Sequence, residues 1–259
     1  MKAMLHVHTC FSSDGELTPR TIGRLAKERG FDAVLLADHY ESLDAESFAA
    51  LREECRWVTN CLLVPGYERS WNGYHVLALA TERLFDDPDP ETWADRVRSA
   101  GGLVVMAHPG RYQHRIPASI LDVCDAIEVW NSKPPYDGSV GPDPRGYGLL
   151  GERRVPLCGQ DLHGVRHLSS VAIEIPDSTV RGALPDGRTI VEAVRRGNYR
   201  MTNGKVSYQG RALSAPATSV LGTFHRGRRI LVDTAISARV GWRRAAAARR
   251  LPTPEVRRP

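Results

Sequence analysis

Three features that would assign this protein to a special class are missing from its 259 residues. No apolar run approaches the roughly 20 residues that a helix needs to cross a bilayer. The five cysteines are an odd number with no Cys-x-x-Cys spacing, so neither a disulfide framework nor a zinc finger is expected. The first strand-like run begins directly after Met1-Lys2, without the apolar stretch and cleavage site of a secretory signal. We therefore expect a cytoplasmic protein without a membrane span.

The net charge of +5 hides an uneven distribution of charge along the chain. Residues 211–259 contain eleven arginines against Asp233 and Glu255, which gives this tail +9 and leaves −4 for the first 210 residues. A mildly acidic body is compatible with the binding of divalent cations. The basic tail could follow a nucleic-acid backbone or an anionic membrane surface, or it could be a solvated extension.

Short β-type runs alternate with helical patterns as far as about residue 205. The predicted strands are Ala3–His8, Ala33–Ala37, Cys61–Glu68, Tyr74–Ala80, Gly102–Ala107, Ala126–Trp130 and Val155–Cys158. The predicted helices are Pro19–Arg29, Ala45–Val58, Pro90–Ala100, Pro117–Val123, Arg145–Glu152 and Thr189–Arg196. This alternation is typical of an α/β fold with a parallel sheet, and seven strands favour a closed or nearly closed barrel. Residues 1–205 are the predicted barrel domain, and residues 206–259 are an Arg- and Ala-rich extension, partly disordered.

Histidine and acidic residues gather at the ends of these predicted strands. His6 and His8 close the first strand, where alternation along the backbone places both side chains on one face. Six of the nine histidines lie at or beside a strand end, with several acids. The full set is His6, His8, Asp14, His39, Glu68, His75, His108, Asp161 and His163. Strand ends in a barrel converge on one centre, so this pattern predicts a metal site.

The chemistry of this set points to a cluster of ions. Imidazole and carboxylate ligands without cysteine suit Mn²⁺, Fe²⁺ or Zn²⁺ and do not suit a structural zinc–thiolate site. Nine ligands are too many for one ion, whereas shared carboxylates would hold two or three ions about 3.5–4 Å apart. Such a cluster activates a bridging water and neutralises a developing oxyanion.

The order and spacing of these motifs resemble the PHP family, named for polymerases and histidinol phosphatase. The motifs are His6-x-His8-Thr9, Ser13-Asp14-Gly15, Asp38-His39, Gly66-x-Glu68, His75, Ala107-His108-Pro109 and Asp161-x-His163. The resemblance implies a distorted, TIM-like (β/α)7 barrel with a trinuclear metal site. By analogy, the first ion is held by His6, His8, Glu68 and Asp161, the second by Glu68, His75 and His108, and the third by Asp14, His39 and His163.

The resemblance also implies the reaction, which is hydrolysis of a phosphate ester by a metal-bridging hydroxide. Asp161 would accept a proton, and Arg111, which follows His108 in a Pro-Gly turn, would bind phosphate. The expected substrates are phosphomonoesters of nucleotides or of small metabolites. The alternatives are a 5′-to-3′ exonuclease acting on short oligonucleotides or RNA and, from another class, a non-catalytic module that binds metal or nucleic acid.

Further residues have both a functional and a structural interpretation. Tyr40, Tyr112 and Trp130 could stack on a base, or they could pack in the core or at its rim. Arg166, with its neighbour His167, could contact substrate or form a salt bridge within a loop.

Two polar residues beside the predicted strand ends are equally open to both interpretations. Asn131 could hydrogen-bond the substrate or a metal-bound water, or it could cap a turn. Asp38 could orient a neighbouring ligand, or it could only cap its strand.

Overall fold

The computed structural model describes residues 1–180 and 186–248, and within the last helix it describes side chains as far as Val232. The strands of this part of the chain form two six-stranded sheets, in the orders β12-β11-β10-β1-β2-β4 and β3-β5-β6-β7-β8-β9. The strands are β1 (Lys2–Val7), β2 (Ala33–Leu36), β3 (Asp38–His39), β4 (Leu62–Val64), β5 (Gly66–Trp71), β6 (Tyr74–Leu79), β7 (Leu103–Met106), β8 (Ala126–Asn131), β9 (Val155–Gly159), β10 (Ala172–Glu174), β11 (Arg200–Thr202) and β12 (Ser207–Tyr208).

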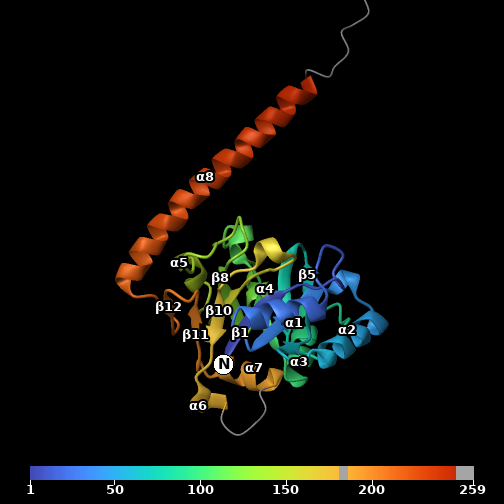
Figure 1. The fold of residues 1–259 in the computed structure, drawn as a ribbon. Helices are drawn as coiled ribbons and strands as arrows, with labels where there is room; N and C mark the ends of the chain where they lie inside the picture. The colour runs from blue at the N-terminus through green and yellow to red at the C-terminus, as the bar shows by residue number, and fades with distance from the viewer. Residues whose placement is uncertain (181–185, 249–259) are drawn as a thin grey trace, which may run out of the picture.

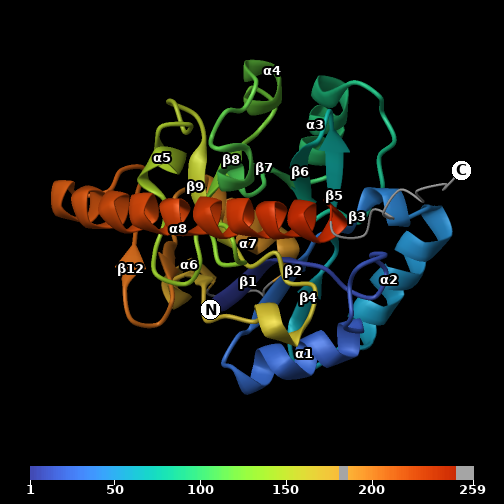
Figure 2. The ribbon, with the colours of Figure 1, turned by 90° about the horizontal axis from the view of Figure 1, so that it is seen from above.

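Helices lie on both sides of the strands. Figure 2 shows α1 and α2 along one side of the body and α3, α4 and α5 along the other. The helices are α1 (Pro19–Glu28), α2 (Ala45–Trp57), α3 (Pro90–Ser99), α4 (Ala118–Leu121), α5 (Pro144–Tyr147), α6 (Asp177–Val180), α7 (Gly187–Arg195) and α8 (Ala215–Ala248), with 3-10 turns η1 (Tyr40–Ser42), η2 (Pro109–Tyr112) and η3 (Val165–His167).

Side-chain caps fix where the main helices begin. The Thr18 hydroxyl accepts a hydrogen bond from the backbone N–H of Thr21, and Pro19 occupies the first turn of α1. Asp44 and Ser47 form a capping box at α2, and Asp89 caps α3. Each cap satisfies a backbone N–H that has no partner within the helix, which stabilises the helix by about 1 kcal/mol. These starts agree with the predicted ones.

The mixed α/β class is confirmed, whereas the predicted closed barrel is not, because the strands are hydrogen-bonded as two sheets. The sheets are also not purely parallel. β6 runs antiparallel to both β5 and β7, because a tight turn at Asn72 and Gly73 connects it to β5. The short strands β10, β11 and β12, which the sequence did not predict, pair in antiparallel fashion as well.

The two sheets are nevertheless connected by main-chain hydrogen bonds beside β1. Beyond the end of β9, the N–H of Gln160 donates to the Leu5 carbonyl at 2.9 Å and the N–H of Leu162 donates to the His6 carbonyl at 3.1 Å. The N–H of His8 in turn donates to the Leu162 carbonyl at 2.8 Å. The ends of β1 and β9 therefore lie side by side, at the edge where the predicted ligands are found.

The predicted C-terminal extension contains a long helix. Figure 1 shows α8 leaving the body at an oblique angle, and its 34 residues correspond to a length of roughly 51 Å. The composition accounts for this, since Ala and Arg both have high helix propensity. The domain boundary at residue 205 stays a prediction, and β12, which lies beyond it, pairs with β11. Residues 249–259 lie outside the described part. None of the described helices combines the length and the hydropathy needed to cross a membrane.

Candidate metal centre

The nine predicted metal ligands lie together at one edge of the strands. Each offers a ring nitrogen or a carboxylate oxygen to at least one group of such atoms within 4.8 Å of one another. They belong to β1, β3, β5 and β6 and to the segments after β1, β7 and β9: His6, His8, Asp14, His39, Glu68, His75, His108, Asp161 and His163. The geometry thus brings the whole set together, and metal ligation by these residues stays a prediction.

The reversed direction of β6 explains how His75 reaches this edge. His6 and His39 lie at or near the ends of β1 and β3, and Glu68 is the third of the six residues of β5, but His75 is the second residue of β6. Because β6 runs antiparallel to β5, its beginning lies beside the end of β5, and His75 pairs with Ser70. An antiparallel strand therefore contributes its first residues to an edge where parallel strands contribute their last.

Glu68 is at the centre of the cluster. It is 2% exposed, and its two oxygens face the ring nitrogens of five histidines. The distances from a Glu68 oxygen are 2.9 Å to His75 Nδ1, 3.1 Å to His39 Nδ1, 3.2 Å to His108 Nε2, 3.6 Å to His6 Nε2 and 3.7 Å to His8 Nε2. A carboxylate in this position can bridge two ions.

Two further carboxylates complete the cluster. Oδ1 of Asp161 lies 3.6 Å from His6 Nε2, 3.4 Å from His8 Nε2 and 3.3 Å from His163 Nδ1. Asp14 has a half-exposed side chain and lies 3.4 Å from His39 Nε2 and 3.2 Å from His163 Nε2. Asp161 is therefore buried within the cluster, whereas Asp14 lies at its solvent-exposed side.

Hydrogen bonds on the far side of the rings orient the first two imidazoles. Nδ1 of His6 lies 2.8 Å from Glu128 Oε1, and Nδ1 of His8 lies 3.2 Å from Ser12 Oγ. Among the described residues, the buried Nε2 atoms of both rings have no hydrogen-bond partner. A buried polar atom without a partner is costly, and an imidazole held through its other nitrogen is the usual arrangement of a metal-binding histidine. The residues therefore fit divalent ions.

The electrostatic environment keeps the carboxylates charged. Burial alone would raise the pKa of Glu68, but hydrogen bonds from His108 and His39 hold it well below its usual range. Burial likewise opposes ionisation of Asp161, but the charge of His6 and the proximity of His8 Nε2, 3.4 Å away, hold its pKa well below its usual range. Burial lowers the pKa of His8 to about 3, which leaves a neutral imidazole able to bind a cation.

Three of these residues have a strained backbone. The φ angles of His6, His108 and Asp161 are 61°, 28° and 48°, in the left-handed region that residues other than glycine rarely adopt. At His6 the register between β1 and β2 also shifts, so that His6 is an extra residue between Leu5 and Val7. Such strain is found at sites where the direction of a side chain matters more than local backbone energy.

The sequence model of the PHP domain family matches residues 4–83. The matched residues supply six of the nine predicted ligands, His6 to His75. His108, Asp161 and His163 lie beyond the match, and the structure places them in the same cluster.

Three known proteins are similar to this chain. The uncharacterized protein MJ1587 of Methanocaldococcus jannaschii is 26% identical over 145 residues, which are 51% of this chain and 82% of that protein. A proposed metal-dependent phosphoesterase from Bifidobacterium adolescentis has 18% identity and a TM-score of 0.46 over 62% of this chain and 87% of its own. An amidohydrolase from Chromobacterium violaceum, solved with sulfate and no metal, has 16% identity and a TM-score of 0.42 over 63% and 88%.

The cluster around Glu68 is supported by residues that the sequence did not identify. Glu128 is 1% exposed, and its Oε2 accepts from the backbone N–H of His108 at 2.8 Å while Oε1 contacts His6. Gly159 makes room for this contact, because an added Cβ would lie 1.9 Å from Glu128 Oε1. Nζ of Lys133 lies 3.0 Å from Asp161 Oδ2. In the sequence, only the position of Glu128 within the alternating pattern of β8 marked this residue, and no motif marked Lys133.

The predicted phosphate ligand, Arg111, is exposed on η2 three residues after His108. Burial opposes its charge, but the neighbouring Tyr136 and Tyr112 raise its pKa, so it is a permanent cation beside the cluster. The ring of Tyr136 stacks on His108 with centroids 5.0 Å apart. The Tyr112 hydroxyl accepts from the backbone N–H of His75 at 3.0 Å and so supports a member of the cluster.

The two polar candidates have structural roles close to the cluster. Asn131 is buried, and its amide donates to Glu128 Oε2 at 2.9 Å. Asp38 accepts from the backbone N–H of Thr9 and from the Ser12 hydroxyl, each at 2.7 Å, and so fixes the loop that orients His8.

The remaining candidates make structural contacts. Trp130 is fully buried, and its indole N–H donates to the Gly138 carbonyl at 2.7 Å. Tyr40 lies under the Arg69 guanidinium. Arg166 forms a loop salt bridge with Glu16 at 2.8 Å.

Proposed function

We propose that this protein is a metal-dependent phosphoesterase with two or three divalent ions (Mn²⁺, Fe²⁺ or Zn²⁺) in the cluster around Glu68. The observation that carries the proposal is that one buried carboxylate faces five imidazole nitrogens at 2.9–3.7 Å. In the proposed trinuclear arrangement, one ion is held by His6, His8, Glu68 and Asp161, one by Glu68, His75 and His108, and one by Asp14, His39 and His163.

Bound ions would supply the charge that activates water and neutralises the transition state. Other residues of the chain would orient the metal ligands, bind the phosphate and exclude water. Glu128 and Ser12 hold the rings of His6 and His8 in position from behind. The Arg111 guanidinium binds a phosphate oxygen and orients the ester. The Tyr136 ring covers His108 and shields that side of the cluster from water.

Asp161 is the proposed proton acceptor. Its lowered pKa keeps it ionised at neutral pH, which is the form that can accept a proton from the attacking water. Lys133, 3.0 Å from Asp161 Oδ2, holds this carboxylate in place and adds a positive charge beside Asp161 and His163.

The test is purification of the full chain with Mn²⁺, followed by metal counting and assays on a phosphomonoester and on short RNA. We expect two or three ions per chain and hydrolysis of the phosphomonoester. His108→Ala and Asp161→Asn should remove most of the activity, and His108→Ala should also lower the metal content. His225→Gln is the matched control, because His225 is equally buried but bonds to the Gly141 carbonyl outside the cluster.

The metal content and the activities together distinguish the proposed function from its alternatives. Stepwise release of nucleotides from RNA without phosphomonoesterase activity would favour a 5′-to-3′ exonuclease. Full metal occupancy without turnover of any ester would favour a non-catalytic metal-binding module. Full activity of both variants after metal removal would show that the proposal is wrong.

A further inference from the structure

The segment between β8 and α5, residues 132–143, carries two side chains that contact the metal centre. Nζ of Lys133 lies 3.0 Å from Asp161 Oδ2. The Tyr136 ring stacks on His108, with centroids 5.0 Å apart. All residues of this segment are described, and none of them belongs to a helix or a strand. The position of both side chains therefore depends on what the segment contacts.

Hydrogen bonds attach the middle of the segment to the end of β8. Oδ2 of Asp137 accepts from the backbone N–H of Asn131 at 2.7 Å. The carbonyl of Gly138 accepts from the indole N–H of Trp130, also at 2.7 Å. The course of the segment beyond Gly138 needs further contacts.

The last residues of the segment pack against α8. Nε2 of His225 donates to the Gly141 carbonyl at 3.1 Å, and Nη1 of Arg229 lies 3.5 Å from Asp143 Oδ2. Gly141 also allows the close approach of Leu221, because an added Cβ would lie 2.8 Å from Leu221 Cδ2. Leu221 and His225 are 4% and 3% exposed, so the contact between α8 and the segment is buried.

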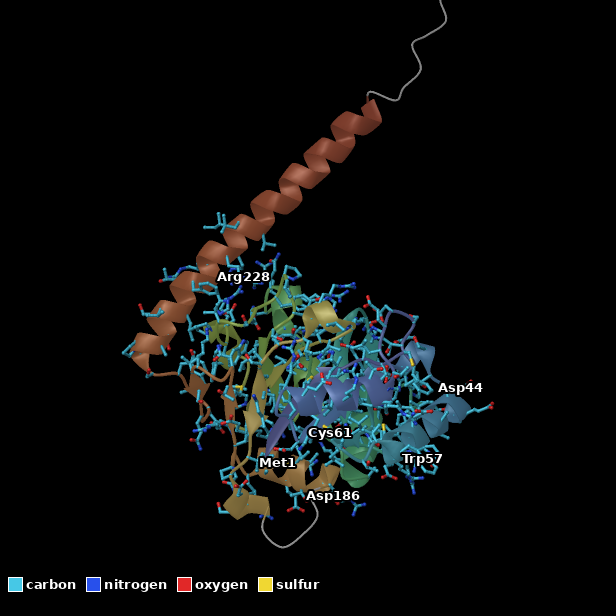
Figure 3. All side chains as sticks on the ribbon, viewed as in Figure 1. Met1, Asp44, Trp57, Cys61, Asp186 and Arg228 are labelled. Carbon is cyan, nitrogen blue, oxygen red and sulfur yellow. The ribbon has the colours of Figure 1, made fainter. Side chains whose placement is uncertain are left out.

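One face of α8 makes these contacts. Leu221, His225 and Arg228 follow one another at intervals of four and three residues, which places them on the same side of a helix. Figure 3 shows Arg228 where α8 passes the body, and an added Cβ at Gly138 would lie 3.4 Å from its guanidinium group. Val220, the neighbour of Leu221, is 69% exposed. We call Leu221, His225, Arg228 and Arg229 the docked face of α8.

We propose that the docked face of α8 positions Lys133 and Tyr136 at the metal centre, with Leu221 as the main positioning residue. This inference rests on the proposed function, because it assumes that phosphate esters react at the adjacent cluster. With β8 holding one side of the segment and α8 the other, the backbone that carries the two side chains has little freedom. A misplacement of about 1 Å can slow a reaction about 100-fold, so α8 controls the rate through this segment.

The test is a double-mutant cycle on the full chain purified with Mn²⁺, with p-nitrophenyl phosphate as the probe. Leu221→Asp places a charge in the buried contact, and Lys133→Met removes the ammonium group beside Asp161. We expect each change to lower kcat/KM about 10- to 100-fold, as is typical for residues that orient a metal ligand or a reacting group. The double variant should lose less than the product of the two single losses, because both changes withdraw Lys133 from the cluster. Losses that simply multiply, as a merely structural defect would produce, would overturn the proposal.

Val220→Asp is the matched control. Val220 lies beside Leu221 on α8 and receives the same charge, but on an exposed side of the helix. It should leave kcat/KM unchanged, and equal losses in Val220→Asp and Leu221→Asp would overturn the proposal.

A second variant keeps the test valid if Leu221→Asp fails to fold. His225→Ala then takes its place in the cycle, because it removes the hydrogen bond to the Gly141 carbonyl. His225→Gln keeps a donor for that carbonyl and should retain the activity that His225→Ala loses. Equal losses in the two His225 variants would contradict a positioning role for this contact.

The two proposals can fail separately. If the protein hydrolyses no ester, the same cycle is measured on the calorimetric Kd for Mn²⁺, to which Lys133 is linked through Asp161 and His163. Coupling between Leu221→Asp and Lys133→Met in that Kd would support the role of α8 although the proposed function had failed. Hydrolysis without coupling would support the metal centre and overturn the role of α8, and the absence of both would overturn both proposals.

Discussion

Two groups of histidine and acidic side chains, one around Glu68 and one formed by Asp137, Asp143 and His225, differ in what surrounds their carboxylates. Around Glu68, the neighbours are imidazole nitrogens, and the Nε2 atoms of His6 and His8 have no other partner among the described residues. Around Asp143, the neighbours are the guanidinium groups of Arg145 and Arg229.

This difference decides what each group can bind. An imidazole can give up its proton and accept a cation, whereas a guanidinium is always charged and excludes one. In both groups the candidate ligand atoms lie within 4.8 Å of one another. Residue type and proximity are therefore insufficient to predict a metal site, and the partners of the carboxylates must be considered as well: those of Asp143 are guanidinium groups, which satisfy its charge without a metal ion.

The largest expected effect comes from removing the charge at the centre of the first group. Glu68→Gln takes a carboxylate away from five imidazoles, so we expect the loss of at least one ion per chain. Activity on a phosphomonoester should fall about 100- to 1000-fold, the scale seen when a group that stabilises the transition state is removed. Metal analysis and steady-state kinetics measure both effects.

The matched change in the second group is Asp143→Asn, which keeps a side chain able to cap α5. It should leave the metal content unchanged. If Asp143→Asn released as much metal as Glu68→Gln, the distinction between the two groups would be lost.

An intermediate effect is expected at Glu128, which contacts the cluster only through His6 and the backbone of His108. Glu128→Gln keeps the shape of the side chain but weakens its bond to His6 Nδ1. We expect a 10- to 100-fold loss of metal affinity or activity, as is typical for a residue that orients a metal ligand. Excess Mn²⁺ in the assay should restore part of the activity. A variant that excess Mn²⁺ does not rescue would point to a direct role for Glu128 in the reaction.

The smallest expected effect concerns the pH dependence of stability in the second group. The pKa of Asp137 is raised to about 8 by burial, so the folded protein keeps a proton that the unfolded chain loses near pH 4. The free energy of unfolding should therefore decrease as pH rises from about 4 to 8, by at most about 1.4 kcal/mol per pH unit from this group. Asp137→Asn should remove this contribution. Denaturant unfolding at several pH values measures it, and identical slopes for both proteins would contradict the raised pKa.

Most strands and helices of the body could be predicted from the sequence because local signals specify them. Buried apolar runs mark β1, β2 and β7, and caps such as Thr18-Pro19 mark the helix starts. The antiparallel direction of β6 was missed because the alternation of strands and helices was taken to indicate a parallel sheet, although Asn72-Gly73 is a strong signal for a hairpin between β5 and β6. The strands β11 and β12 have three and two residues, too few for a periodic signal.

The cluster could be predicted at the level of residue types because its members recur at strand ends. The residues that hold the cluster in position could not be predicted, because they come from distant parts of the chain. Glu128 contacts His6 across 122 residues, and Lys133 contacts Asp161 from a loop with no recognisable motif. The contribution of α8 was missed for another reason. Its Arg- and Ala-rich composition suggested disorder, although both residues favour helices.

The left-handed backbone at His6, His108 and Asp161 has a consequence for substitution at these positions. Each such residue costs about 1–3 kcal/mol relative to a relaxed conformation, and glycine would relieve that cost. Glycine would, however, also delete a fully buried side chain at each position and leave a cavity, which costs roughly 2–5 kcal/mol. The packing of these three side chains therefore offsets the backbone strain that directs them, and neither contribution can be removed without the other.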